Sequence, residues 1–316
     1  MNNIARFLTL FFLLLIFGCM AAIGHAADPP RAFGLQFTKH GVKAAQVQSH
    51  PKFAAAPLPA SDTALESYFY FTNQGSIGSC GPSTTQECID ALVQRDTRQH
   101  CVISRLDVYQ RTLQAQGQFP QDAGVNNSTM LLVIKNGALL ESTWPYVPSK
   151  LGKLPKESAQ TQTERSTHAV IKGYTVPTND NGYAARQCIH NLRCPIVVGR
   201  LWYNSQFTVA AKRCTTKDAN GKSITVTRWV IASARGSVAG GHDIAGIAYD
   251  DNMIFPDGSK GGFEIHNHWA ADQAGTQPWG DSRGSAWMPY KDAFSSRQND
   301  DWLCFETTNI TAPAKP

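Results

Sequence analysis

The stretch NQGSIGSCGPSTTQECIDAL, residues 73–92, places one cysteine between a Gly-Ser pair and a Gly-Pro pair, directly before a helical pattern. Pro82 suits a first helical turn, and apolar residues at 88, 89, 92 and 93 share one face, which predicts a helix over about 82–94. A thiol at a helix N-terminus is stabilised as thiolate by unpaired backbone N–H groups and by the helix dipole. The stretch therefore makes Cys80 either a nucleophile or a disulfide partner, and the spacing alone does not decide.

The rest of the composition describes a globular chain. Its 316 residues, 42% of them hydrophobic, suffice for one two-lobed domain or two small ones. The formal charge of +5 is spread without a basic run or an aromatic-interleaved stripe. Solubility accounts for this charge, and we expect no nucleic-acid partner.

The N-terminus has the layout of a secretory signal peptide over residues 1–26. One basic residue, Arg6, precedes an apolar run from Phe7 to Phe17, and the small residues that follow end at Ala26. The run is too short for a membrane span. We therefore expect a secreted or periplasmic protein with no membrane contact after cleavage. A lipoprotein acylated on Cys19 is the less favoured alternative.

Cysteine counting leaves one thiol over. The expected mature chain holds seven cysteines, and an odd number in an exported protein leaves one free or paired with another chain. Sequence proximity suggests two bridges, Cys88–Cys101 and Cys188–Cys194, which leaves Cys214 with Cys304; six cysteines allow fifteen connectivities, and this set is a guess. Cys80 is then the remaining thiol.

The two halves of the chain differ in texture. Residues 28–60 read as a linker, and helices are expected over about 82–94, from Ser104 onward, and from Ser128 to a stop at Gly137. Beyond about residue 165, seven short runs rich in β-branched and aromatic residues alternate with turn formers, interrupted by one helix near 182–192. A helical lobe followed by an antiparallel β lobe is an α+β arrangement.

Candidate partners for Cys80 lie far along the chain. A thiolate needs an imidazole to hold its proton and an acceptor to orient that imidazole. His242 begins a buried strand after two glycines, and Asn267 follows in the next strand. Because side chains alternate along a strand, we expect Asn267 to face His242 while His266 and His268 point away.

These motifs together resemble the papain-like cysteine peptidases of the C1 type, over nearly everything from Leu58 to the C-terminus. The matching stretches are NQGSIGSCGPST, GGHDIAGIAYDD, IHNHWAADQAGTQPWGDSRGSAWMPY, ISRLDVYQRT and DAGVNNSTMLLVIKNGALLESTWPYVP. The last two are similar to the helical lobe of bacterial members. The resemblance implies a two-lobe fold, with a helical left lobe at about 75–165, a β-barrel-like right lobe at about 166–316, and the active-site cleft between them.

The resemblance also implies the roles of individual residues. Cys80 is the nucleophile, His242 the base and acid, and Asn267 the group that orients His242. Gln74 donates a side-chain N–H to an oxyanion hole completed by the Cys80 backbone N–H, and Trp269 shields the His242–Asn267 bond from water.

The sequence departs from the family pattern in several places. Gly81 follows the nucleophile where an apolar or aromatic residue is usual, and Asp243 follows His242 where a small apolar residue is commoner. His268 and Ala270 replace the Ser and Gly of the asparagine motif. The spacing from Cys80 to His242 exceeds the roughly 130 to 150 residues typical of the family, which we attribute to an insertion near 212–228.

Other possible sites carry less weight. His266 and His268 have the spacing of a zinc half-site, but without a third ligand we read them as surface histidines and expect no metal. Asn126, Asn127 and Asn309 head Asn-x-Ser/Thr triplets, which matter only in a eukaryotic secretory route. The Trp144-Pro145-Tyr146 stretch and Trp279 are expected to pack.

The expected protein is an exported cysteine peptidase that cleaves peptide bonds through an acyl-thioester on Cys80. We expect it to act on peptide or protein substrates as a monomer and to need no cofactor. An N-terminal extension or short pro-segment, residues 27–57, precedes the peptidase domain at 58–316. It is much shorter than the pro-domain of the cathepsins. We hypothesise that it packs on or near the cleft. The alternatives are a silent binding protein on the same fold and an acyl transferase of transglutaminase type, although the latter usually carries Asp at the third position.

Overall fold

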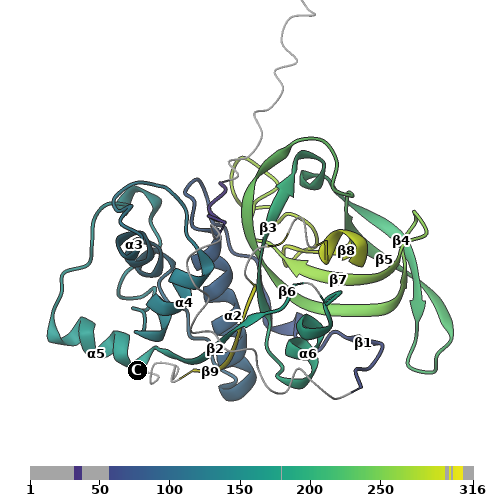
Figure 1. Cartoon of the computed structure of the whole chain (residues 1–316), viewed down its shortest axis with the longest axis horizontal. Coiled ribbons are helices and arrows are strands. Elements are labelled where there is room, and N and C mark those ends of the chain that lie inside the picture. The colour runs from purple at the N-terminus through teal and green to yellow at the C-terminus, as the bar shows by residue number, and fades with distance from the viewer. Residues whose placement is uncertain (1–31, 38–56, 179, 296–298, 300–301, 309–316) are drawn as a thin grey trace, which may run out of the picture.

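The computed structural model describes residues 32–37, 57–178, 180–295, 299 and 302–308. The expected signal peptide and Cys19 lie outside these residues. Helices gather on one side and strands on the other, with α2 between them (Figure 1). The helices are α2 (Cys80–Thr97), α3 (Arg105–Ala115), α4 (Asn127–Lys135), α5 (Ala159–Thr167), α6 (Tyr183–Asn191) and α7 (Tyr290–Ala293), with short turns η2 (Glu66–Tyr68), η3 (Pro148–Lys150) and η4 (Asn204–Phe207).

Side-chain caps explain where several helices begin. The Ser104 hydroxyl accepts the Asp107 N–H at 3.1 Å ahead of α3, as the sequence predicts. Asn126 caps α4 in the same way through Thr129 N–H, and the chain turns away at Gly137, whose φ is +84°. Helix α5 was not expected. Its sequence has little apolar periodicity, but Ser158 and Thr161 form a reciprocal capping box that starts it.

The sheet contains nine strands and partly closes into a barrel. They are β1 (Ser61–Asp62), β2 (Val170–Val176), β3 (Ile196–Tyr203), β4 (Val209–Lys217), β5 (Ser223–Ile231), β6 (Val238–Ile254), β7 (Lys260–His266), β8 (Ser285–Pro289) and β9 (Trp302–Thr308). The order β2-β9-β3-β6-β4-β5-β8-β7 is completed by pairing of β7 with β6, so β6, β4, β5, β8 and β7 form a ring. All pairings are antiparallel except the short β5–β8 contact. The α+β fold with a barrel-like β lobe is therefore confirmed.

The hairpin of β4 and β5 fills the stretch where the sequence suggested an insertion. Its two strands pair from Val209↔Ile231 to Lys217↔Ser223. The sequence predicted β5 but missed β4, because β4 has two exposed basic residues in its middle and only two buried positions. The hairpin extends the barrel and accounts for part of the long Cys80–His242 spacing.

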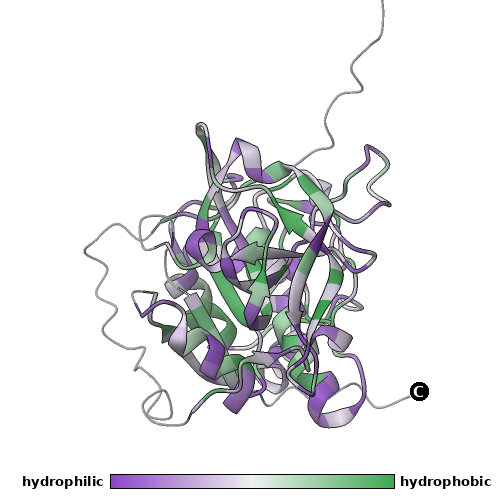
Figure 2. Ribbon diagram, turned by 90° about the vertical axis from the view of Figure 1, so that its right-hand side faces the viewer, coloured by the Kyte–Doolittle hydropathy of each residue, from purple (hydrophilic) through white to green (hydrophobic). Residues whose placement is uncertain are grey.

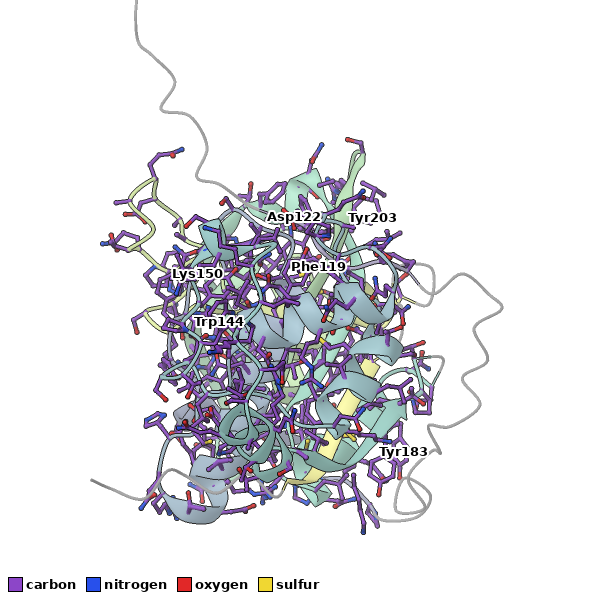
Figure 3. All side chains as sticks on the ribbon, turned by 90° about the vertical axis from the view of Figure 1, so that its left-hand side faces the viewer. Phe119, Asp122, Trp144, Lys150, Tyr183 and Tyr203 are labelled. Carbon is purple, nitrogen blue, oxygen red and sulfur yellow. The ribbon has the colours of Figure 1, made fainter. Side chains whose placement is uncertain are left out.

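The core runs through both halves of the molecule. Apolar segments lie mainly inside and polar segments mainly outside (Figure 2). The largest fully buried side chains include Trp202, Trp269, Trp287 and Trp302. Trp279 is also buried, at 2% exposure, and Lys150 covers the half-buried Trp144 ring at 4.8 Å (Figure 3). The two tryptophans expected to pack therefore do so.

The expected disulfides are not formed in the described part of the chain, where all seven cysteines from Cys80 to Cys304 carry thiols. Cys214 on β4 and Cys304 on β9 are separated in the sheet by β3 and β6, a distance of about 14 Å at ordinary strand spacing, whereas a bridge needs Cα atoms within about 7 Å. The thiols of Cys188 and Cys194 instead each meet that of Cys304. Sequence proximity was the wrong guide because it ignores strand order.

Within the described residues, no helix is both long enough and apolar enough to span a bilayer.

Candidate active site

Cys80 is the first residue of α2 and is completely buried. The sequence placed the helix start two residues later, but the position of Cys80 at the N-terminus is as expected. Its Sγ donates a long hydrogen bond to Asp243 Oδ2 at 3.7 Å. The nucleophile candidate therefore lies at the positive end of an 18-residue helix, in contact with a carboxylate from the β lobe.

His242 lies on β6 and is bound to Asn267. His242 Nε2 and Asn267 Oδ1 are 3.0 Å apart, which makes the histidine nitrogen the donor. The pairing Ala245↔His266 aligns β6 with β7, and Asn267 follows directly after β7. The Trp269 ring stacks on the His242 ring with centroids 3.9 Å apart and covers this bond. His242 Nδ1 has no hydrogen-bond partner among the described residues.

Gln74 is also buried, and its side-chain amide is directed toward the same region. Its Nε2 donates to Ile77 O at 2.9 Å and to Ala32 O at 3.1 Å. Its backbone N–H donates to His268 O at 2.9 Å, which ties the loop before α2 to the loop after β7. The structure thus joins His242, Asn267 and Trp269 directly, places Cys80 against Asp243, which is next to His242 in the chain, and ties Gln74 to the loop that follows Asn267.

Residues 32–37 of the N-terminal extension lie between the two lobes and cover this site (Figure 1). On one side Gln36 N donates to Val125 O at 2.7 Å, and Val125 N donates to Gly34 O at 2.5 Å. On the other side Leu35 N donates to Gly241 O at 3.1 Å, and the Phe33 ring lies 5.4 Å from the Trp269 ring. The segment thus bridges the two lobes, with Gly34 next to Cys80 and the Phe33 ring 6.1 Å from that of His242.

Burial under this segment favours uncharged forms of both groups. The pKa of the Cys80 thiol is raised well above its usual value, first by burial and second by the Asp243 carboxylate. The pKa of His242 is lowered well below its usual value, first by burial and second by the nearby His268. In this covered state the pair is a neutral thiol and a neutral imidazole.

The unusual residues Gly81 and Asp243 fit one another. A Cβ at Gly81 would lie 2.7 Å from Val125 Cγ2 and 3.0 Å from Asp243 Oδ2. Asp243 is completely buried, and its Oδ1 accepts from Asn127 Nδ2 at 2.7 Å. The glycine therefore leaves the room in which the carboxylate reaches Cys80, so the two departures from the family pattern form one structural feature.

His266 and His268 are not surface residues. Both are completely buried, and the His268 ring lies 5.3 Å from that of His242 instead of pointing away. The prediction failed because β7 ends at His266, so strand alternation does not extend to His268. Both contact Glu87 of α2, a residue that sequence reasoning missed. Among the described residues, no three ligand-type side chains are arranged to hold a metal ion.

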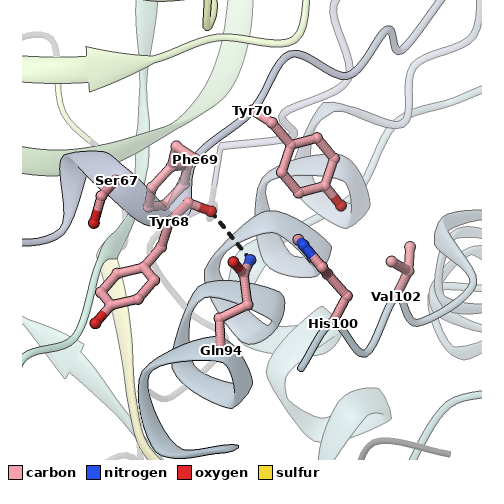
Figure 4. A pocket seen from close by; sticks show the side chains of 7 residues that line it. All are labelled: Ser67, Tyr68, Phe69, Tyr70, Gln94, His100 and Val102. Carbon is pink, nitrogen blue, oxygen red and sulfur yellow. Dashed lines mark hydrogen bonds between the residues drawn. The ribbon is translucent and has the colours of Figure 1, made fainter. Parts of the chain in front are cut away.

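A separate hollow of about 480 Å³ lies near the other end of α2, lined by Tyr68, Tyr70, Gln94 and His100 among others (Figure 4). Its one buried carboxylate, Asp90, accepts from Tyr70 Oη at 3.1 Å and from Gln94 Nε2 at 3.0 Å, and it contacts His100 Nδ1 at 2.9 Å. A carboxylate with these partners needs no ligand, and it offers no nucleophile.

No model of a known protein family matches the chain, and no curated protein matches it. Solved structures do. Xylellain, a cysteine protease from Xylella fastidiosa, aligns with a TM-score of 0.64 at 21% identity, over 89% of this chain and 97% of that one. Procathepsin B S9 from Trypanosoma congolense aligns with a TM-score of 0.59 at 14% identity, over 88% and 86% of the two chains.

The cysteine protease and lectin-like domains of Cwp84, a surface layer associated protein of Clostridium difficile, align with a TM-score of 0.56 at 13% identity, over 83% of this chain and 53% of that one. At such identities the similarity concerns the fold. It extends over most of this chain in all three comparisons. The chain therefore has the fold of the papain-like cysteine proteases.

Proposed function

We propose that the protein is a cysteine peptidase that hydrolyses peptide bonds with Cys80, His242 and Asn267. Two groups under one segment carry the proposal: a thiol at the N-terminus of α2, approached by Gly34, and an imidazole approached by Phe33, whose Nε2 is fixed by Asn267 at 3.0 Å. Because Nε2 is held by Asn267, Nδ1 is the nitrogen left to exchange a proton with Cys80.

The proposed reaction proceeds in two halves. With the groove open, the Cys80 proton passes to His242 Nδ1, and the thiolate attacks the substrate carbonyl carbon. The developing oxyanion accepts from Gln74 Nε2 and from the Cys80 backbone N–H. The imidazolium of His242 protonates the leaving amine, which leaves an acyl-thioester on Cys80. Water, deprotonated by His242, then attacks this thioester and releases the acid.

We further propose that residues 32–37 act as a short pro-segment. Ala32 O accepts from the same Gln74 Nε2 that the oxyanion would use, and burial keeps both Cys80 and His242 uncharged. Removal of the segment would free Gln74 Nε2 from its hydrogen bond to Ala32 O and let water reach Cys80 and His242. Hydration favours the charged thiolate–imidazolium pair. The hypothesis that the extension narrows access is in this way supported by specific contacts.

The proposal also covers the cellular location, the oligomeric state and the substrate class of the enzyme. The layout of residues 1–26 favours export to the periplasm or the exterior, and we propose a monomer that acts on peptides or proteins without a cofactor. Two other functions compete: a silent binding protein that uses the groove, and an acyl transferase that gives the acyl group to an amine. The intact set of Cys80, Gln74, His242 and Asn267 opposes the first, and Asn267 in place of Asp opposes the second.

The test is labelling of the full-length chain with an epoxide thiol trap at neutral pH, with the modified residue mapped by mass spectrometry and a fluorogenic peptide library run in parallel. Cys80 should be labelled once the N-terminal segment is removed or displaced, and peptides should then be cleaved. Cys80→Ser should abolish both. A labelled Cys80 without cleavage of any peptide would support the binding protein, and transfer to added amines in preference to water would support the transferase.

A further inference from the structure

A buried carboxylate and two imidazoles lie beside the proposed catalytic histidine. Glu87 is seven residues beyond Cys80 on α2, and its side chain is only 3% exposed. Its Oε1 lies 3.6 Å from His266 Nε2, and its Oε2 lies 3.6 Å from His268 Nδ1. The Thr72 hydroxyl also donates to Oε1. His268 in turn meets His242 edge to face, with ring centroids 5.3 Å apart. One chain of contacts thus links Glu87 to His242.

Glu87 is a buried anion at neutral pH. Burial by itself would raise its pKa, but the nearby imidazoles of His266 and His268 outweigh burial and hold the pKa well below its usual range. Burial lowers the pKa of His268, against the opposing pull of Glu87. The side chain between Glu87 and His242 is therefore a neutral imidazole, which excludes water from the gap and leaves the field of the carboxylate poorly screened.

We propose that Glu87, acting across His268, is a positioning residue that stabilises the positive charge which His242 carries while Cys80 is a thiolate. This inference rests on the proposed peptidase function. His242 is completely buried, and burial opposes its protonation, so the thiolate–imidazolium pair needs a compensating negative charge. Glu87 supplies this charge from the side of His268, and it acts to raise the pKa of His242.

Other charged or titratable side chains act on the same pair of histidines. They come from several elements: Arg105 on α3, Arg200 on β3 and His266 at the end of β7. Asp243, on β6 next to His242, faces Cys80 instead. Arg200 pairs with His242 across β3 and β6 and opposes its protonation. The carboxylate of Asp243 contacts the Cys80 thiol and the Asn127 amide. Glu87 is the carboxylate of this set that is directed toward the histidines.

The sign of the effect follows from the charge. Glu87→Gln keeps the size of the side chain and removes the anion, so the imidazolium of His242 becomes less stable. The pair then loses its imidazolium proton at lower pH, so the alkaline end of its pH range falls. The acid end does not rise, because the imidazolium is present both before and after the Cys80 thiol loses its proton there. An anion at roughly 8 Å in a medium of effective dielectric constant about 20 shifts a pKa by about 1.5 units.

The experiment measures the rate of Cys80 alkylation by iodoacetamide in the full-length chain across the pH range. Mass spectrometry maps the modified residue, so that slow labelling of Cys80 during brief openings of the covering segment is still detected. In Glu87→Gln the alkaline step of the profile, at which the imidazolium loses its proton and the alkylation rate changes, should fall by about 1.5 pH units. The matched control is His266→Gln, which alters the other imidazole on the same carboxylate, next to Phe69 and Ser285 instead of His242. Its alkaline step should move less than a third as far.

Glu87→Asp separates charge from shape. It keeps the anion and changes the packing, so its alkaline step should lie between those of the parent and of Glu87→Gln. An alkaline step of Glu87→Gln that coincides with that of the parent would overturn the proposal, as would an equal shift in His266→Gln. Should Glu87→Gln not fold, a fall of the alkaline step by the full shift of about 1.5 units in Glu87→Asp would overturn it, because the anion is still present there. Failure of the parent protein to cleave any peptide would count against the peptidase function, whereas the alkylation profile would still decide the role of Glu87.

Discussion

Gly34→Val should displace the covering segment from the groove. A Cβ at Gly34 would lie 1.8 Å from the carbonyl oxygen of Gly78, far inside van der Waals contact, and the neighbour is backbone that cannot turn aside. The segment must therefore lift, with loss of the hydrogen bonds between Val125 N and Gly34 O, Leu35 N and Gly241 O, and Gln36 N and Val125 O. At about 1 kcal/mol net for each bond, the open form gains about 3 kcal/mol, or about 10²-fold in population.

The assay is the rate of Cys80 alkylation at neutral pH in the full-length chain. While the open form is rare, this rate is proportional to its population, so Gly34→Val should accelerate labelling by about 10²-fold until opening is complete. Phe37→Leu, at the partly exposed end of the same segment, keeps a large apolar side chain and should leave the rate nearly unchanged. Equal labelling rates in the parent and in a folded Gly34→Val chain would refute the reasoning, because the contact would then not hold the groove shut.

Three further predictions test other parts of the site. With the groove open, Gln74→Ala should lower peptide turnover by about 10² to 10³-fold yet leave alkylation intact, because only the oxyanion loses a donor; equal losses in both would contradict this role. The pKa values of His242 and His268 are lowered by burial, so the unfolded chain binds protons at these two residues more readily than the folded chain does. The free energy of unfolding, measured in urea, should therefore keep its full value above about pH 6.5 and fall below that pH by up to about 2.7 kcal/mol per pH unit. The variant His268→Ser removes one of the two groups and should halve that slope. Gly81→Trp, the kind of residue common in the family, should lower the free energy of unfolding by about 3 kcal/mol through overpacking. Asp243→Ala in the same chain should recover part of this loss. If urea denaturation shows no recovery, Gly81 and Asp243 do not form one structural feature.

Several features of the site were predictable because they depend on residue types in short stretches of sequence. The position of Cys80 at a helix N-terminus follows from the proline and the apolar repeat, although the helix begins two residues earlier than expected, and the contact between His242 and Asn267 follows from two neighbouring strands. The capping of α3 by Ser104 is equally local. In each case a short stretch of sequence contains the information that determines the geometry.

The errors come from features that require the three-dimensional arrangement. Strand alternation was extended one step beyond the end of β7, which wrongly placed His268 on the surface. Glu87 gave no signal, since an acidic residue on a helix is usually solvated, and only the approach of the β lobe buries it. The pairing of Cys214 with Cys304 needed the strand order, which proximity in sequence does not provide.

The closed ring of strands also limits the strand edges that a second copy could extend. A ring has no unpaired edge, so the sheet of the described residues opens outward mainly at β2, the end of the strand order. That strand carries register shifts between Val170 and Lys172 and between Lys172 and Gly173, and Lys172 is exposed. Irregular hydrogen bonding and a lysine are features that discourage a second copy from adding its own strand. The open edge of the sheet is thus poorly suited to aggregation.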